Sequence, residues 1–87
     1  MESAMNNYPS DHQHFSLYDL GCATALVTLG FELADIDRIN PRRSLFLFTH
    51  SSEIEQAARD YWSDNLTVNP RRYFDDLKML KSRIYAG

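Results

Sequence analysis

The tetrapeptide NPRR occurs twice in this sequence, at 40–43 and at 69–72, and each copy sets two guanidinium groups side by side. Guanidinium groups hold phosphates through paired N–H donors, and exposed aromatic rings near them can stack on unpaired bases. Aromatic side chains follow the first copy within a few residues. The pattern predicts binding of nucleic acid, in particular a single strand, through Arg42, Arg43, Phe46, Phe48, Arg71, Arg72, Lys78 and Lys81.

Two other interpretations of these residues stay open. In the first, the arginines pair with carboxylates on a solvated surface and the phenylalanines belong to the core. The carboxylates concerned are Asp35, Asp37, Asp75 and Asp76. In the second, the chain is a protein-interaction module that inhibits a host or defence complex, for example a CRISPR complex. The acidic side chains that favour it lie just before the first NPRR copy, at Glu32, Asp35 and Asp37.

The charge of the chain is unevenly distributed. The net charge is −3 and the pI is near 5.4, which disfavours a generic nucleic-acid-binding protein. Residues 1–37 nevertheless contain six acidic side chains and no Lys or Arg, whereas residues 38–87 contain nine basic and six acidic ones. The C-terminal half is therefore the half that favours phosphate binding.

The sequence contains residue types that could support catalysis or bind a metal, but it does not arrange them as such a site requires. Cys22 lies in the apolar stretch LGCATALVTLG, where a thiol is usually inert. The three glycines match no phosphate-binding loop. His12 and His14, beside Asp11, have ligand chemistry but no second anchoring cluster in the sequence. We expect no enzyme activity, no cofactor and no metal.

The cellular compartment follows from the same composition. One cysteine cannot form an intramolecular disulfide, and the first residues lack the basic and apolar regions of a signal peptide. No stretch approaches the roughly 20 apolar residues of a membrane span. The sequence therefore predicts a cytoplasmic protein.

Periodicity predicts one compact α+β domain at 15–87 after a flexible tail at 1–14. Ser16, with Asp19 three residues on, predicts a helix over about 17–29 that ends at Gly30. Alternating stretches near 31–39 and 44–50 predict a two-stranded β-hairpin with the first NPRR copy as its turn. The exposed hairpin edge would allow homo-oligomers to form.

Two helices complete the predicted order of helix, hairpin, helix and helix. Ser52 and Glu55 predict a capping box, and an apolar stripe follows that ends in Tyr61 and Trp62, which we expect in the core. Asn69 is predicted to cap the last helix. The residues that follow the two NPRR copies have different periods, so the tetrapeptide is not a duplicated unit.

Two long segments, GFELADIDRINPRRSLFLF and DYWSDNLTVNPRRYFDDLKMLKSRIY, carry a resemblance to a known family. They combine a GFEL helix end, an NPRR turn into an aromatic and aliphatic strand, a DYW helix end and a final PRRYFDDLKMLKSRIY segment. This pattern resembles a small bacterial and phage family catalogued as domain of unknown function 5659. The resemblance implies an accessory protein of a phage or mobile element, acting in replication, host takeover or defence evasion. It assigns a role to no residue.

Overall fold

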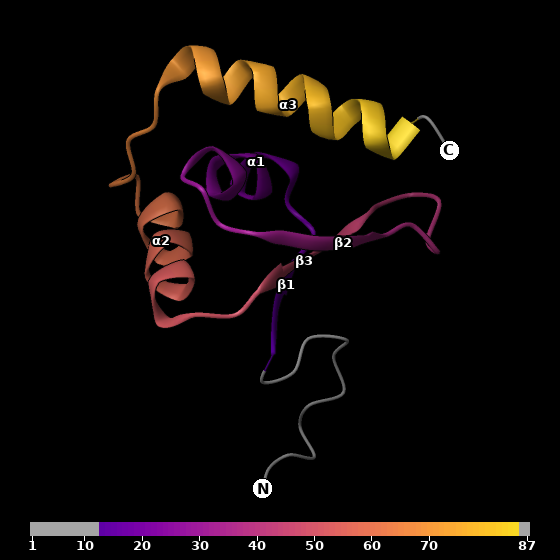
Figure 1. Cartoon of the computed structure of the whole chain (residues 1–87), viewed down its shortest axis with the longest axis horizontal. Coiled ribbons are helices and arrows are strands. Elements are labelled where there is room, and N and C mark those ends of the chain that lie inside the picture. The colour runs from indigo at the N-terminus through magenta and orange to yellow at the C-terminus, as the bar shows by residue number, and fades with distance from the viewer. Residues whose placement is uncertain (1–12, 86–87) are drawn as a thin grey trace, which may run out of the picture.

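The computed structural model describes residues 13–85, which form three strands and three helices. The elements are β1 (His14–Leu17), α1 (Leu20–Thr28), β2 (Leu33–Asp37), β3 (Leu45–Thr49), α2 (Ser52–Trp62) and α3 (Pro70–Tyr85) (Figure 1). The predicted α+β class is confirmed. The tail predicted for residues 1–14 lies almost entirely outside the described residues, and its last residue, His14, begins β1.

The sheet has three antiparallel strands in the order β1-β3-β2, so the prediction of a two-stranded hairpin was incomplete. β2 and β3 do form the predicted hairpin. β1 pairs with the other edge of β3, with Phe15 opposite Phe48 and Leu17 opposite Phe46. A hairpin alone would leave that edge of an apolar strand without hydrogen-bond partners. The third strand was missed because it is short and overlaps a helix-start pattern.

A bulge in β2 places two core residues on the same face of the sheet. Leu33 pairs with Phe48, and Ile36 pairs with Phe46, although strict alternation would put them on opposite faces. The register shift falls between Leu33 and Asp35 and restores the match. Both phenylalanines of the central strand therefore lie between apolar partners on either side.

Helix α1 begins at Leu20, three residues later than predicted. Its N-cap is Asp19, whose Oδ2 accepts the N–H of Cys22 at 2.8 Å, and Ser16 belongs to β1. The predicted end at Gly30 is confirmed, since Gly30 has φ +99° and donates to the carbonyl of Val27. This left-handed residue closes a Schellman motif that turns the chain toward β2.

Helix α2 buries a narrow stripe of small and aliphatic residues. Its N-cap is Ser51, one residue before the prediction, and the Ser51 hydroxyl accepts the N–H of Ile54. Ile54, Ala57 and Ala58 are buried as the helical spacing predicts. Trp62, which we expected in the core, is 65% exposed, because this last residue of the helix lies about 80° around it from Ile54, at the edge of the buried stripe.

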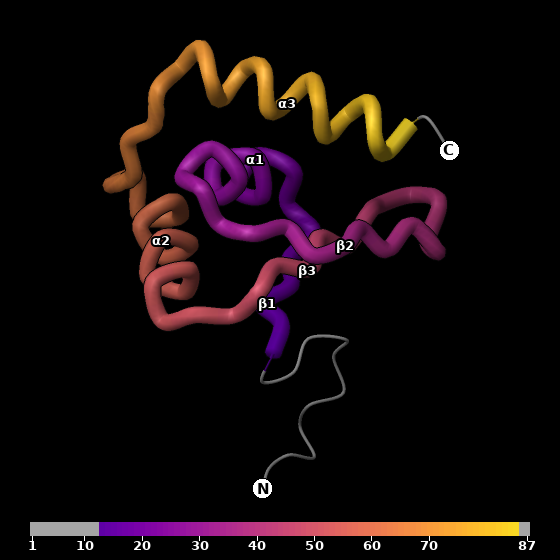
Figure 2. Tube along the Cα trace, in the orientation of Figure 1, coloured from indigo at the N-terminus to yellow at the C-terminus, as the bar shows by residue number. Residues whose placement is uncertain are grey.

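The three helices are layered on one face of the sheet (Figures 1 and 2). α1 lies between the sheet and α3, and α2 packs against α1 at one end. The core between these layers contains Cys22, Ala23, Leu26, Phe46, Phe48, Ile54, Ala57, Ala58 and Leu80. Within residues 13–85, no helix combines the length and apolar character needed to cross a membrane.

Candidate nucleic-acid interface

Phe46 and Phe48 are core residues. Their exposed fractions are 1% and 0%, and both pack in the cluster formed with α1 and α2. A buried ring has no free face to offer a base, so the predicted stacking role of Phe46 and Phe48 is wrong. The physical reason is their place on the central strand, where large apolar side chains fill the space beneath α1.

The first NPRR copy forms the turn between β2 and β3. The Oδ1 of Asn40 accepts the N–H of Arg42 at 2.8 Å, and its carbonyl accepts the N–H of Arg43 at 3.3 Å. These bonds fix a tight turn that leaves both arginine side chains exposed. Within residues 13–85 neither arginine joins an ion pair, so pairing with Asp35 or Asp37 does not occupy them.

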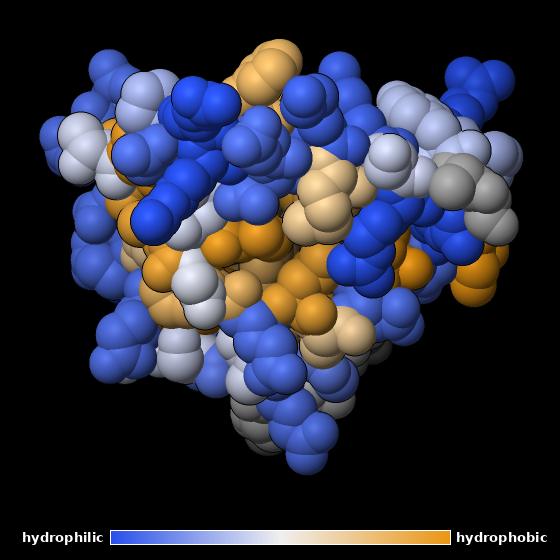
Figure 3. Space-filling view, turned by 45° about the horizontal axis from the view of Figure 1, so that its top comes forward, coloured by the Kyte–Doolittle hydropathy of each residue, from blue (hydrophilic) through white to orange (hydrophobic). Residues whose placement is uncertain are grey.

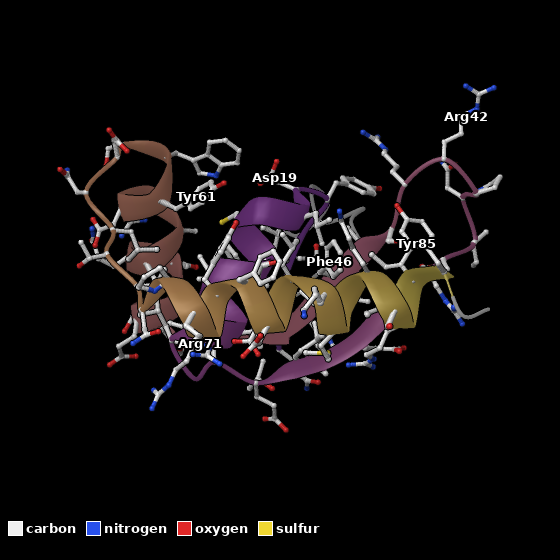
Figure 4. The ribbon with its side chains drawn as sticks, turned by 90° about the horizontal axis from the view of Figure 1, so that it is seen from above. Asp19, Arg42, Phe46, Tyr61, Arg71 and Tyr85 are labelled. Carbon is white, nitrogen blue, oxygen red and sulfur yellow. The ribbon has the colours of Figure 1, made fainter. Side chains whose placement is uncertain are left out.

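The second NPRR copy starts α3 with the same asparagine chemistry. The Oδ1 of Asn69 accepts the N–H groups of Arg71 and Arg72 at 3.0 Å, which confirms the predicted N-cap. Here the chain continues into a helix, since the Asn69 carbonyl accepts the N–H of Tyr73. Figure 4 shows Arg42 and Arg71 at opposite ends of the molecule, so the two copies do not form one surface.

A recess of about 210 Å³ lies where the β2–β3 turn meets the C-terminal end of α3. We call it the arginine recess. Its lining includes Arg42, Arg43, Tyr18 and Tyr85, and an edge of Phe46 also contributes. The two tyrosines are 47% and 76% exposed, so their rings are accessible from solvent. In Figure 3 hydrophobic side chains also reach the surface at the right-hand end of the molecule, among strongly hydrophilic ones.

Arg43 and Tyr18 form the best-defined contact of the arginine recess. The guanidinium carbon of Arg43 lies 4.0 Å from the centroid of the Tyr18 ring, in a cation–π arrangement. The contact holds a guanidinium and an aromatic ring beside each other at the protein surface. One group can neutralise a phosphate while the other stacks on the attached base.

Arg38 connects the turn to α3. Its Nη1 donates to the carbonyl of Arg83 at 3.0 Å, at the helix end where carbonyl groups lack intrahelical partners. A second recess, of about 400 Å³, is lined by Arg38 together with Asn40, Pro41, Ser44, Ile84 and Tyr85. Tyr85 thus belongs to both recesses, and the Arg38 bond keeps it beside the turn.

Lys78 and Lys81 lie on an exposed face of α3, away from buried Leu80. The Nζ of Lys78 lies 5.0 Å from the centroid of the Phe74 ring, and Phe74 is 56% exposed. Neither lysine has an ion-pair partner among residues 13–85. Of the nearby carboxylates, Asp76 accepts a hydrogen bond from the Thr28 hydroxyl at 2.7 Å and so holds α1 against α3.

The acidic residues of the alternative interface have local roles. The Oδ1 of Asp35 accepts the N–H of Ile36, and that of Asp37 accepts the N–H of Ile39. Glu32 accepts the hydroxyl of Thr49 on the neighbouring strand. Asp35 is exposed on the edge strand β2 and Glu32 is exposed just before this strand, where charged side chains also discourage pairing with another sheet.

Titratable groups with shifted pKa values cluster at the start of α1, outside the arginine recess. Burial, and then the charge of Asp19, raise the pKa of the Cys22 thiol to about 11, which leaves it protonated and unreactive. Burial is also the main cause that raises the pKa of Tyr61, followed by the negative charge of Asp19. Figure 4 shows Asp19 and Tyr61 close together, and the Tyr73 hydroxyl donates to the Gly21 carbonyl at 3.4 Å. The cluster joins three helices.

Residues 13–85 contain no group of three or more His, Cys, Asp and Glu side chains that could hold a metal ion. His12 and Asp11, which the sequence offers as ligands, lie outside the described residues. The Nε2 of His50 lies within hydrogen-bond distance of the Oε2 of Glu55, at 2.6 Å, near the start of α2.

Sequence reasoning missed the aromatic residues at the surface. Tyr18 lies in the two-residue connection between β1 and α1, which was assigned to a helix. The position of Tyr85 on this face of α3 could have been predicted from the sequence. Phe74, Lys78, Lys81 and Tyr85 follow one another at helical spacings of four, three and four residues. The sequence does not bring Tyr18 near Arg43, because that contact depends on the pairing of β1 with β3.

The comparisons with known proteins concern the whole of the described fold. Comparisons with curated proteins and with solved structures found no match. A family described as "Domain of unknown function (DUF5659)" matches residues 12–86, which include every strand and helix named above. The chain therefore belongs to the family described as domain of unknown function (DUF5659).

Proposed function

We propose that the protein is a non-enzymatic, single-stranded nucleic-acid-binding accessory protein of a phage or mobile element, with the arginine recess as its binding site. The observation that carries the proposal is the Arg43–Tyr18 contact at 4.0 Å, which joins a phosphate-binding group to an exposed ring. Arg42 and Tyr85 repeat the same pair of chemistries in the same recess. The arginines are available to phosphates, since within residues 13–85 they have no ion-pair partner.

Single strands fit this site better than duplexes. Exposed tyrosines can stack only on bases that are not already stacked in a helix, and the lining arginines follow the backbone. The negative net charge of the whole chain disfavours general attraction to nucleic acid, so binding would depend on this local group of residues.

Fluorescence polarisation with labelled thymidine and uridine tetranucleotides tests the proposal. We expect binding at low salt and a fall in log affinity with log salt of about 0.7 per neutralised phosphate. R42A/R43A should weaken binding by about tenfold and make this slope shallower by about 1.4, because two phosphate contacts are lost. Y18A/Y85A should weaken binding by at least about fivefold at an unchanged slope, because stacking of each base contributes about 1–3 kcal/mol.

The second NPRR copy supplies a matched control. R71A/R72A removes the same charge from the same tetrapeptide, but at the other end of the molecule (Figure 4). We expect it to change tetranucleotide affinity less than about threefold. Equal losses for the two double variants, or no binding at low salt, would overturn the proposal.

A second candidate function is a protein-interaction module that inhibits a host or defence complex. It is favoured by Glu32, exposed just before edge strand β2, by Asp35, exposed on this strand, and by Asp37 at its end. Pull-down from host lysate with and without nuclease separates the two functions. A partner retained after nuclease treatment and lost in E32Q/D35N supports this candidate, whereas loss of all partners on nuclease treatment supports nucleic-acid binding.

A further inference from the structure

We infer that a bound single strand extends from the arginine recess along α3, over a cation–aromatic ladder made of Phe74, Lys78, Lys81 and Tyr85. This inference rests on the proposed function and adds the path and length of the ligand. At about 100° per residue, these four residues fall within about 60° of one another around the helix. They therefore form one straight row along α3.

The ladder is exposed, and its two lysines lie between two aromatic rings. Phe74 and Tyr85 are 56% and 76% exposed, and the two lysines are also exposed. Lys78 lies over the Phe74 ring, with its Nζ 5.0 Å from the ring centroid. This contact repeats the pairing of Arg43 with Tyr18, about two to three helical turns along α3 from Tyr85. The row therefore offers a ring for stacking at each end and two cations for phosphates between them.

Both ends of the ladder open into a recess. Tyr85 lines the arginine recess. Phe74 lines an apolar recess of about 430 Å³ between the end of α2 and the start of α3, together with Tyr61, Leu66, Val68 and Tyr73. The ladder therefore runs along one side of α3, from the arginine recess to the apolar recess.

The length of the ladder sets the length of the ligand. Phe74 and Tyr85 are eleven residues apart, or about 16 Å along a helix that rises 1.5 Å per residue. At about 3.4 Å per stacked nucleotide, this distance corresponds to about five nucleotides. Affinity should therefore rise with oligonucleotide length until the strand covers the recess and the ladder, and stay nearly constant for longer strands.

The same helix offers a matched control for the lysines. Arg72 and Arg83 lie on α3 about 150–170° around the helix from the middle of the ladder. K78Q/K81Q and R72Q/R83Q therefore remove equal charge from one helix, on the ladder and away from it. All four side chains are exposed, so both variants should fold as the wild type does, which circular dichroism checks.

The experiment measures affinity for thymidine oligonucleotides of increasing length. For strands of about ten nucleotides, K78Q/K81Q should weaken binding about tenfold and R72Q/R83Q less than about threefold. For a dinucleotide, which fills only the arginine recess, K78Q/K81Q should have less than about a twofold effect. Photocrosslinking with iodouracil-substituted strands should label Phe74 or Tyr85.

The outcomes separate this inference from the proposed function. If no strand of any length binds, both fail. If binding depends on Arg42 and Arg43 but the two α3 variants behave alike, or if length has no effect beyond a dinucleotide, the inference fails and the recess alone is the site. Crosslinks on residues outside the ladder and the recess would also overturn it.

Discussion

The hydroxyl of Tyr61 lies 2.5 Å from the position that a Cβ atom on Gly21 would occupy. Gly21 lies in the first turn of α1, and the Tyr61 hydroxyl reaches it from the end of α2. Replacing a helical glycine by alanine ordinarily stabilises a protein by about 0.5–1 kcal/mol. Here we expect G21A to lower the free energy of unfolding by about 1 kcal/mol, since the added methyl group must displace Tyr61. Urea denaturation measures the change.

The control for this prediction is Y61F, which removes the displaced hydroxyl. In the Y61F background, G21A should become neutral or stabilising, so the double-mutant cycle should give a coupling energy of at least about 1 kcal/mol. Additive effects of the two substitutions would show that the close approach does not determine the response.

Helices α1 and α2 both end in a Schellman motif, but a different residue adopts the positive φ in each. After α1 the position is Gly30, with φ +99°, and after α2 it is Asp64, with φ +65°. In the second motif Asp64 donates to the carbonyl of Tyr61, and Asn65 donates to that of Asp60. We expect D64G to raise the free energy of unfolding by about 0.5–1 kcal/mol, because glycine adopts positive φ without steric conflict.

A neighbouring glycine substitution provides the comparison. Ser63 has φ −94° and its hydroxyl donates to the carbonyl of Arg59 at 2.8 Å. S63G should therefore lower stability, and thermal denaturation should show opposite shifts for the two variants. Shifts of the same sign would contradict the explanation based on φ.

The stability of the fold should fall at alkaline pH because of Cys22. Burial raises the pKa of its thiol from the ordinary value of 9.0 to about 11 in the folded protein. Between these values the unfolded chain loses the proton that the folded chain keeps, so stability is full below about pH 9 and decreases by about 2 kcal/mol toward pH 11. Denaturation midpoints across this range measure the decrease.

The matching variant is C22A, which has no ionisable group at this position. It should be less stable than wild type at neutral pH, because a buried side chain is shortened, but its stability should change less between pH 9 and 11. Parallel pH profiles for wild type and C22A would assign the alkaline loss to other groups, of which Tyr61, with its raised pKa, is one.

The asparagines of the two NPRR copies should have separable effects. Asn69 caps the helix α3, and N69A should lower the free energy of unfolding by about 1 kcal/mol. Asn40 holds only a surface turn, so N40A should affect global stability less. N40A should instead weaken oligonucleotide binding, by about two- to fivefold, because the turn that positions Arg42 and Arg43 becomes mobile.

Paired urea denaturation and polarisation measurements on both variants check this prediction. N69A should keep wild-type affinity for a tetranucleotide wherever it is folded. If N40A binds like wild type while R42A/R43A does not, the orientation of the turn is unimportant and only its charge contributes.

The sequence by itself determined the features that depend on neighbouring residues. The Gly30 helix end, the Asn69 cap, the hairpin around the first NPRR copy and the buried stripe of α2 all follow from local hydrogen bonding and periodicity, and the structure contains each of them. The family resemblance was also visible in local motifs, and the match over residues 12–86 confirms it.

Tertiary structure decided which of these features lie together. The third strand, the exposure of Trp62 and the burial of Phe46 and Phe48 depend on which faces of the sheet and helices are covered. The two NPRR copies have the same letters and the same asparagine bonds, yet Arg42 and Arg71 lie at opposite ends. Local chemistry is set by a few adjacent residues, whereas position in space is set by strand pairing and helix packing between distant parts of the chain. For that reason the contact of Arg43 with Tyr18 could be found only in the folded molecule.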